Sequence, residues 1–211
     1  MSRFQQAISE GDGISVIPQV AGDVAALAAA AERAGAEAIA VATLGDAEAA
    51  RAATALPVLI RGPVAGRDTL GRLGDAGADA LVVAYEEVAD DEVLLEELLA
   101  SADELDLDCL LDVRDEEELG RALERVDPDI VLISRHDGAS EEEELERALD
   151  LLPDVPAGKL VVAECDLVAR EQVVALERAG VDALLVRNLA GVPGDFSRAV
   201  EELVGGARPS T

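Results

Sequence analysis

The chain is poor in the basic side chains that bind phosphate groups. Its 211 residues include 45 acidic and 17 basic ones, the net charge is −28, and Lys159 is the only lysine. A nucleic-acid partner needs a basic face that displaces counterions, and an anionic membrane attracts the same kind of face. We therefore expect neither a nucleic-acid nor a membrane partner. Acidic runs such as 141–144 are typical of solvated helix faces, and their abundance suggests adaptation to a salty cytoplasm.

Aromatic residues are nearly absent as well. The chain has no tryptophan, and its aromatic residues are Phe4, Tyr85 and Phe196. Recognition of bases by stacking has few side chains to use here. The core must be built from Val, Leu, Ile and Ala.

The two cysteines and the single histidine give no pattern of metal ligands. Cys109 lies within an apolar run and is expected in the core, whereas Cys165 lies at the end of such a run. No Cys-x-x-Cys pair occurs, so we predict no metal and no cofactor. The sequence also has no apolar run as long as a membrane span and no apolar leader of a signal peptide, and we predict a cytoplasmic protein.

What the chain does contain is one unit used eight times, a short β-branched run followed by a helix rich in Ala, Glu and Leu. Three of the joints from helix to strand are nearly identical: 34–38 (AGAEA), 76–80 (AGADA) and 179–183 (AGVDA). In each joint, glycine can adopt the left-handed conformation that ends a helix, and an acidic residue precedes an apolar run.

Eight strand–helix units predict an α/β fold, a (β/α)8 TIM barrel with short loops. Right-handed crossovers place every helix outside the barrel and leave no exposed sheet edge. We expect a single domain over residues 1–211, with 1–13 as a short leader and 205–211 as a tail outside the repeat. The predicted strands are 14–19, 38–43, 58–61, 80–84, 109–113, 130–134, 160–164 and 183–187.

In such a barrel the functional side chains lie at the carboxyl ends of the strands. Polar residues there project into the mouth, where we expect a small anionic or polar ligand. The only histidine, His136, follows one of these strands directly, in the layer where function concentrates. The candidates are Gln19, Thr43, Arg61, Asp112, Arg114, Ser134, His136, Glu164, Asp166, Arg187 and Asn188.

Four of these strands, read in order, resemble the indole-3-glycerol phosphate synthase family. Residues 56–61 (LPVLIR) are similar to the family's Leu-Pro-Val-Leu-Arg-Lys-Asp, and 110–116 (LLDVRDE) to its Leu-Val-Glu-Val-His-Asp-Glu. Residues 133–137 (ISRHD) correspond to Ile-Asn-Asn-Arg-Asp, and 161–166 (VVAECD) to Val-Ala-Glu-Ser-Gly. The resemblance covers nearly the whole chain from its first strand. It implies a barrel related to the enzyme that closes and decarboxylates a carboxyphenylamino-deoxyribulose phosphate in tryptophan biosynthesis.

The resemblance also implies which catalytic positions are changed. The Glu and Lys of the family's first strand fall on Ile17 and Gln19, its catalytic Lys falls on Arg61, and its next Glu falls on Asp112. Glu164 keeps the family residue. Arginine stays protonated at any useful pH and cannot act as the proton donor, and an Asp is one methylene shorter than a Glu.

The family's phosphate site is changed too. The glycines whose N–H groups bind phosphate fall on Asp166 and Arg187, and Asp166 would repel the phosphate. Because the two strands are neighbours, these side chains could pair and fill the site, with Asn188 at its rim. Alternatively, Arg187 itself binds an anion. After Gln19 the chain runs into the next helix with no loop that could close over a substrate.

Three interpretations follow. The chain is a synthase-like barrel whose ancestral activity is lost or weak, a non-catalytic barrel that serves as a binding or assembly partner, or a barrel used for another small polar substrate. In the last, Arg61, Asp112, His136 and Glu164 would form an acid–base and anion-binding group. An open pocket on which His136, Asp112 and Glu164 converge would favour chemistry or binding. A mouth filled by Arg61–Asp112 and Asp166–Arg187 pairs would favour a scaffold.

Overall fold

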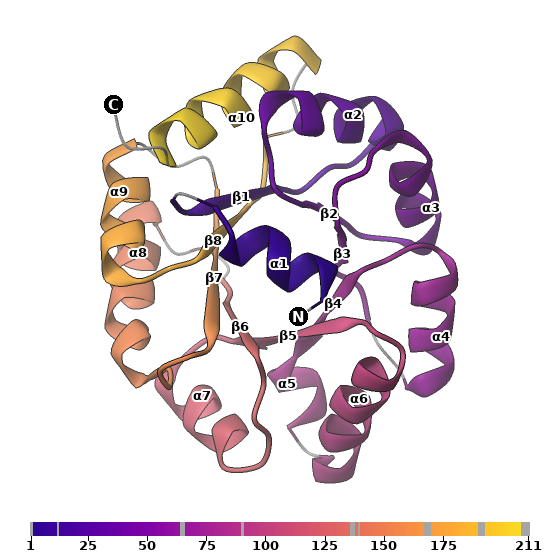
Figure 1. The fold of residues 1–211 in the computed structure, drawn as a ribbon. Coiled ribbons are helices and arrows are strands. Elements are labelled where there is room, and N and C mark those ends of the chain that lie inside the picture. The colour runs from indigo at the N-terminus through magenta and orange to yellow at the C-terminus, as the bar shows by residue number, and fades with distance from the viewer. Residues whose placement is uncertain are drawn as a thin grey trace.

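The computed structural model describes residues 2–11, 13–63, 66–89, 91–135, 138, 140–166, 170–189 and 193–207. Within them, each strand is followed by a helix, with two helices between β4 and β5, and the strands form one parallel eight-stranded sheet, which confirms the predicted (β/α)8 barrel (Figure 1). The strands are β1 (Ser15–Pro18), β2 (Ile39–Val41), β3 (Val58–Ile60), β4 (Ala80–Ala84), β5 (Asp108–Val113), β6 (Ile130–Ile133), β7 (Leu160–Cys165) and β8 (Ala183–Val186).

The helices surround the sheet, apart from α1, which lies across the centre of the ring in Figure 1. They are α1 (Arg3–Ser9), α2 (Val24–Ala34), α3 (Leu44–Ala53), α4 (Arg67–Asp75), α5 (Tyr85–Val88), α6 (Glu92–Glu104), α7 (Glu116–Leu123), α8 (Glu141–Leu151), α9 (Arg170–Ala179) and α10 (Pro193–Ala207), with a 3₁₀ turn η1 (Leu152–Asp154) after α8. Of the helices in the described ranges, none combines the length and the apolar character needed to cross a membrane.

The ring of strands closes between β1 and β2. Neighbouring strands follow the order β1-β8-β7-β6-β5-β4-β3-β2, and a parallel bridge between Gln19 and Ala40 joins the two ends of this order. The N–H of Val20 donates to the carbonyl of Ala40 at 2.9 Å beside it. Because all strands are parallel, their carboxyl ends meet at one end of the barrel, and we call this end the mouth.

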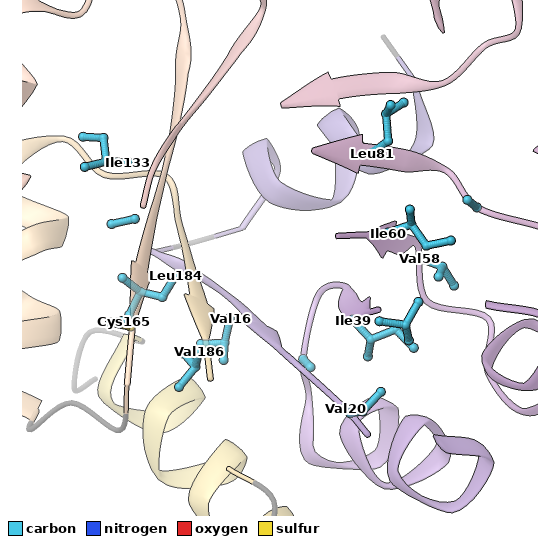
Figure 2. Close-up of a cluster of buried hydrophobic side chains, with 14 of the residues drawn as sticks. Val16, Val20, Ile39, Val58, Ile60, Leu81, Ile133, Cys165, Leu184 and Val186 are labelled. Carbon is cyan, nitrogen blue, oxygen red and sulfur yellow. The ribbon is translucent and has the colours of Figure 1, made fainter. Parts of the chain in front are cut away.

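Alternation along the strands separates the core into two clusters. In β8, Ala183 and Leu185 belong to the cluster inside the barrel, whereas Leu184 and Val186 pack against the helices (Figure 2). Successive strand residues point to opposite faces, so two clusters are what a closed parallel sheet covered by helices requires. The strand residues inside the barrel are Ile17, Ala38, Ala40, Leu59, Ala80, Val82, Leu110, Ile130, Leu132, Val162, Ala183 and Leu185.

Helix α1 closes the amino end of the barrel. Residues 1–13 stand outside the repeat, and no pattern in them predicts a helix with a core role. Phe4 and Ile8, four residues apart on one face of α1, are 0% and 2% exposed and join the interior cluster. The guanidinium of Arg3 pairs with Asp79 next to β4 at 2.9 Å, which holds the helix across the opening.

The acidic residues of the three repeated joints have a structural task. Their glycines, Gly35, Gly77 and Gly180, have φ angles of 90°, 84° and 102°, as the joints predict. The carboxylate two residues after each glycine accepts a hydrogen bond from a backbone N–H of the preceding strand. The N–H that donates lies close to the start of that strand. The pairs are Glu37 with Val16 (2.8 Å), Asp79 with Val58 (2.8 Å) and Asp182 with Val161 (2.7 Å).

Candidate functional site

A polar layer of inward-facing residues forms the mouth. The apolar interior ends with residues such as Leu59, Leu110 and Val162, and the residue two positions later on the same strand again faces inward. At this position the sequence changes from apolar to polar on six strands and has alanine on the other two. The layer consists of Gln19, Ala42, Arg61, Ala84, Asp112, Ser134, Glu164 and Arg187.

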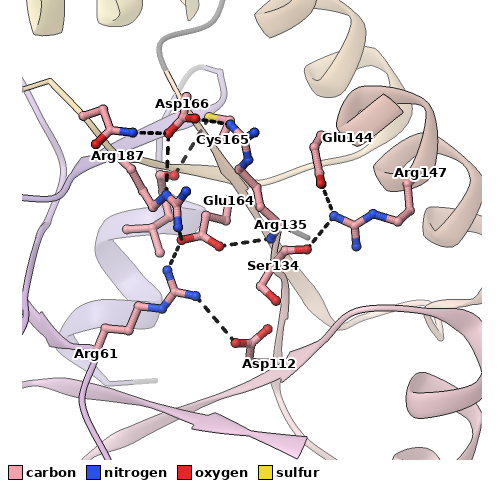
Figure 3. A network of polar contacts seen from close by, with 12 residues as sticks. Arg61, Asp112, Ser134, Arg135, Glu144, Arg147, Glu164, Cys165, Asp166 and Arg187 are labelled. Atoms are coloured by element: carbon pink, nitrogen blue, oxygen red, sulfur yellow. Dashed lines mark hydrogen bonds and ion pairs between the residues drawn. The ribbon is translucent and has the colours of Figure 1, made fainter. Parts of the chain in front are cut away.

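Glu164 lies at the centre of this layer. Its side chain is 0% exposed, and its Oε1 is paired with the guanidinium of Arg61 and lies 3.5 Å from Nη1 of Arg187 (Figure 3). Its Oε2 accepts the backbone N–H of Arg135 at 3.0 Å. A buried carboxylate needs such partners because its charge has lost the solvation of water. Glu164 is therefore held by groups from three strand ends.

Asp112 is buried as well, but it is poorly compensated. Its side chain is 6% exposed, and Oδ2 lies 3.8 Å from Nη2 of Arg61. Its Oδ1 is buried and has no hydrogen-bond partner within the described part of the chain. Burial raises the pKa of Asp112, and the Ser134 hydroxyl, Arg61 and Arg114 only partly oppose that effect. Burial also lowers the pKa of Arg61, and the negative charge of Asp112 raises it by less than burial lowers it.

A second group of ion pairs lies at the ends of β7 and β8. Oδ1 of Asp166 is 3.5 Å from Nε of Arg187 and accepts a hydrogen bond from Nδ2 of Asn188 at 2.6 Å. Oδ2 of Asp166 pairs with the guanidinium of Arg135. The side chains of Asp166 and Arg187 therefore face each other, and side chains occupy the position that the resemblance gives to a phosphate site.

Two arginines of this site were not among the sequence candidates. Arg147 of α8 donates to the carbonyl oxygens of Arg114 and Ser134, both at 2.6 Å, and pairs with Glu144. It thereby ties the ends of β5 and β6 to the helix outside. Arg135 directly follows the candidate Ser134 at a strand end, so its position in the sequence could have placed it at the mouth. Arg147 lies within the acidic helix 141–151, and nothing in the sequence places it there.

The other candidates lie at different places around the mouth. Gln19 donates its backbone N–H to Val186 at 2.8 Å, and its Oε1 is buried without a donor among the described residues. Thr43 caps α3, and Arg114 pairs with Glu86 of α5. His136 lies outside the described residues, so its predicted role stays a prediction.

The remaining chemistry-bearing residues lie away from this network or are covered. Lys159 pairs with Asp127 and precedes β7, at the amino end of the barrel. Burial raises the pKa of the Cys109 thiol to about 12, which keeps it protonated and unreactive. Cys165 is 8% exposed, beside the carbonyl of Leu185. In the ranges that the structure describes, no three His, Cys, Asp or Glu side chains are grouped to hold a metal ion.

Comparison with known proteins identifies the family of this barrel. The sequence model of the indole-3-glycerol phosphate synthase family matches residues 18–203. The chain belongs to the indole-3-glycerol phosphate synthase family. Synthases from two strains of Acidithiobacillus ferrooxidans are each 38% identical over 138 residues, which is 65% of this chain and 51% of the relative. The chain thus spans about half the length of these curated relatives.

Solved structures with the same fold come from another enzyme of tryptophan biosynthesis. A mutant tryptophan synthase alpha-subunit from Pyrococcus furiosus superposes with a TM-score of 0.71 and 19% identity, over 92% of this chain and 99% of that one. Tryptophan synthase from M. tuberculosis in its aminoacrylate-bound form gives a TM-score of 0.74 and 18% identity, over 99% and 100%. At this level of identity the likeness shows the barrel fold alone.

Proposed function

We propose that this member of the family does not carry out the ring-closing carboxy-lyase reaction and that its mouth is an ion-paired binding site for a small polar molecule. The observation that carries the proposal is the position of Arg61. Its guanidinium stands where the resemblance places the catalytic lysine, and it is paired with Glu164 and lies 3.8 Å from Asp112.

An acid catalyst must release its proton during the reaction, and a guanidinium between two carboxylates is unsuited to this. Burial lowers its pKa, but a guanidinium starts so far above the neutral range in which general acids work that it stays protonated. Neither Glu164 nor Asp112 is presented to a substrate as an isolated carboxylate, since both lie against Arg61. The described mouth residues include no lysine, and Lys159 is at the amino end of the barrel.

The ends of β7 and β8 support the same conclusion. A phosphate there would meet the carboxylate of Asp166, which already accepts a hydrogen bond from Asn188 and pairs with Arg135. Breaking these contacts to admit a dianion would leave Asp166 beside another negative charge. The two predicted pairs, Arg61 with Asp112 and Asp166 with Arg187, favour a scaffold over new chemistry. The support for binding is that the side chains of Arg61 and Arg187 stay partly exposed at the mouth.

The test is an assay of the purified chain with the carboxyphenylamino-deoxyribulose phosphate, followed by the fluorescence of the indole product. The chain has no tryptophan, so its own fluorescence in this range is low. A full-length Acidithiobacillus ferrooxidans synthase serves as the positive control. We expect the chain to give the rate of the buffer blank, because the lysine positions are occupied by Gln19 and Arg61.

The Glu164→Gln variant separates true activity from contamination. Turnover by the wild-type chain that disappears in this variant, while circular dichroism shows it folded, would contradict the proposal. Turnover that is equal in both proteins would come from a contaminating synthase.

A further inference from the structure

The arginines of the mouth share one buried carboxylate. Oε1 of Glu164 contacts both Arg61 and Arg187, and the exposed fraction of the side chains is 0% for Glu164, 26% for Arg61 and 31% for Arg187. Each guanidinium is planar and carries five N–H donors, so one buried carboxylate cannot use them all. Part of both groups therefore faces the solvent at the mouth.

Arg187 is the more weakly held of the two. Its contacts with Glu164 and Asp166 are both 3.5 Å long, beyond the usual 2.7–3.2 Å of a hydrogen bond to nitrogen. A third anionic group could therefore form shorter bonds with Arg187 than its present neighbours do. Such a group would approach from the solvent side, where both guanidinium groups are accessible.

We propose that Arg61 and Arg187 together bind the carboxylate of a small monoanion at the mouth and that Asp112 takes up a proton when this ligand binds. This inference rests on the proposed function, because it assigns the ligand class of the same ion-paired site.

The charges around the two arginines favour a carboxylate over a phosphate. Glu164 and Asp166 lie within 3.5 Å of Arg187, and a doubly charged group placed there would be repelled by both. A single carboxylate matches the flat fork of a guanidinium and can be bound by two parallel N–H donors. The site therefore suits a ligand with one negative charge.

The uptake of a proton is inferred from the surroundings of Asp112. The groups that act on its charge are Arg61 from β3, Arg114 at the end of β5, the hydroxyl of Ser134 after β6, and Glu118 of α7. Arg114 is itself paired with Glu86 of α5, which reduces what it offers Asp112. An anion that draws Arg61 toward the solvent removes the nearest positive charge from a buried carboxylate. The neutral acid is then the more stable form of Asp112.

The experiment is a calorimetric titration of the full chain with acetate at constant ionic strength. It is run at about pH 6 and at about pH 7, because burial raises the pKa of Asp112 and proton uptake depends on the pH. Two cationic buffers of different ionisation enthalpy, Bis-Tris and imidazole, report any proton taken up. We expect saturable binding of acetate with a heat that differs between the buffers. Sulfate, which is a dianion over this whole pH range, is titrated in the same way and should bind more weakly.

Three variants assign the effect to residues. Arg187→Gln should weaken acetate binding about tenfold or more, because it removes a charged hydrogen-bond donor. Arg67→Gln removes an equal charge from an exposed pair with Glu104 and should leave the affinity unchanged. Asp112→Asn should still bind acetate, with the same heat in both buffers.

Absence of acetate binding, equal or tighter binding of sulfate, or a buffer-dependent heat that persists in Asp112→Asn would overturn the inference. Because the titration contains no synthase substrate, its outcome is separate from the activity assay. Turnover in that assay would contradict the proposed function and leave the acetate result unchanged. A failed titration with no turnover would reject the carboxylate as the ligand of this site and leave the loss of the lyase reaction standing.

Discussion

At the scale of single residues, the mouth contrasts two buried carboxylates. Glu164 has two guanidinium groups on one oxygen and a backbone N–H on the other. Asp112 has the Ser134 hydroxyl, two arginines of which the nearer is 3.8 Å away, and an oxygen with no donor in the described ranges. Charge is therefore well compensated at Glu164 and poorly compensated at Asp112. Removing these two charges should have opposite effects on stability.

We predict that Asp112→Asn stabilises the protein relative to the wild type near neutral pH. The folded-state pKa of Asp112 is raised above its usual 3.8, so the native state holds the proton more tightly than the unfolded chain does. The stability that this provides is present below the unfolded pKa and is lost as the pH rises through the folded pKa. The gain of the variant over wild type should therefore grow with pH across this window.

Urea unfolding of both proteins, at about pH 4 and about pH 7, measures this difference, because the effects of the other acidic residues cancel. A difference that shrinks as the pH rises would show that the carboxylate of Asp112 is stabilised by its surroundings. Glu164→Gln is the contrasting variant, and it should cost roughly 2–3 kcal/mol at neutral pH because it leaves two arginines without their shared carboxylate.

At the scale of elements, the barrel is sealed at its amino end by α1 and lined with ion pairs at its carboxyl end. Only seven residues form α1, too few for a stable helix in isolation, so it depends on Phe4 and Ile8 inside the barrel. The repeated joints contribute further, since each acidic residue satisfies an N–H that would otherwise lack a partner near a strand's start.

Phe4→Ala should destabilise the protein by about 3–4 kcal/mol, because it removes a fully buried ring and leaves a cavity at the barrel axis. Gln6→Ala on the exposed face of the same helix is the matched control and should change the stability by less than about 0.5 kcal/mol. Chemical denaturation monitored by circular dichroism gives both values. Equal effects of the two substitutions would mean that the packing of α1 against the barrel interior does not stabilise the protein.

Sequence reasoning found the strands and most of the mouth because both depend on short-range periodicity. Arg61, Asp112 and Glu164 each lie two residues after an inward-facing apolar residue, so strand register alone places them in one layer. The core role of α1 was missed because it depends on where the barrel axis lies, which no local pattern reports. The contacts of Arg147 with the ends of β5 and β6 were missed for a similar reason, since an arginine in an acidic helix is expected at the surface.

At the scale of the whole molecule, the net charge of −28 is the dominant feature. Ion pairs among the described residues use many of the arginines, and several of these lie at the mouth, so much of the remaining surface is acidic. Repulsion among these charges opposes the compact state and is weakened by added salt. The expected adaptation to a salty cytoplasm is a prediction about stability and solubility, separate from the chemistry of the mouth.

Raising potassium chloride from about 0.1 M to about 1 M should raise the melting temperature, since the screening length falls from about 10 Å to about 3 Å. Differential scanning calorimetry at both concentrations measures the change. Potassium chloride is the suitable salt because, unlike sulfate, it does not strongly increase apolar burial. A melting temperature that is unchanged or lower at high salt would reject the proposed adaptation.

We propose that ion pairs at the mouth stand in place of the synthase's catalytic groups. The most direct measurement is a single-turnover assay, with the purified chain in excess over the carboxyphenylamino-deoxyribulose phosphate and the quenched mixture analysed for the indole product. We expect the substrate to be recovered unchanged after incubation, although the folded chain is in excess over it. Conversion of the substrate by wild-type protein, and not by Glu164→Gln, would show that the ion-paired mouth still carries out the synthase reaction.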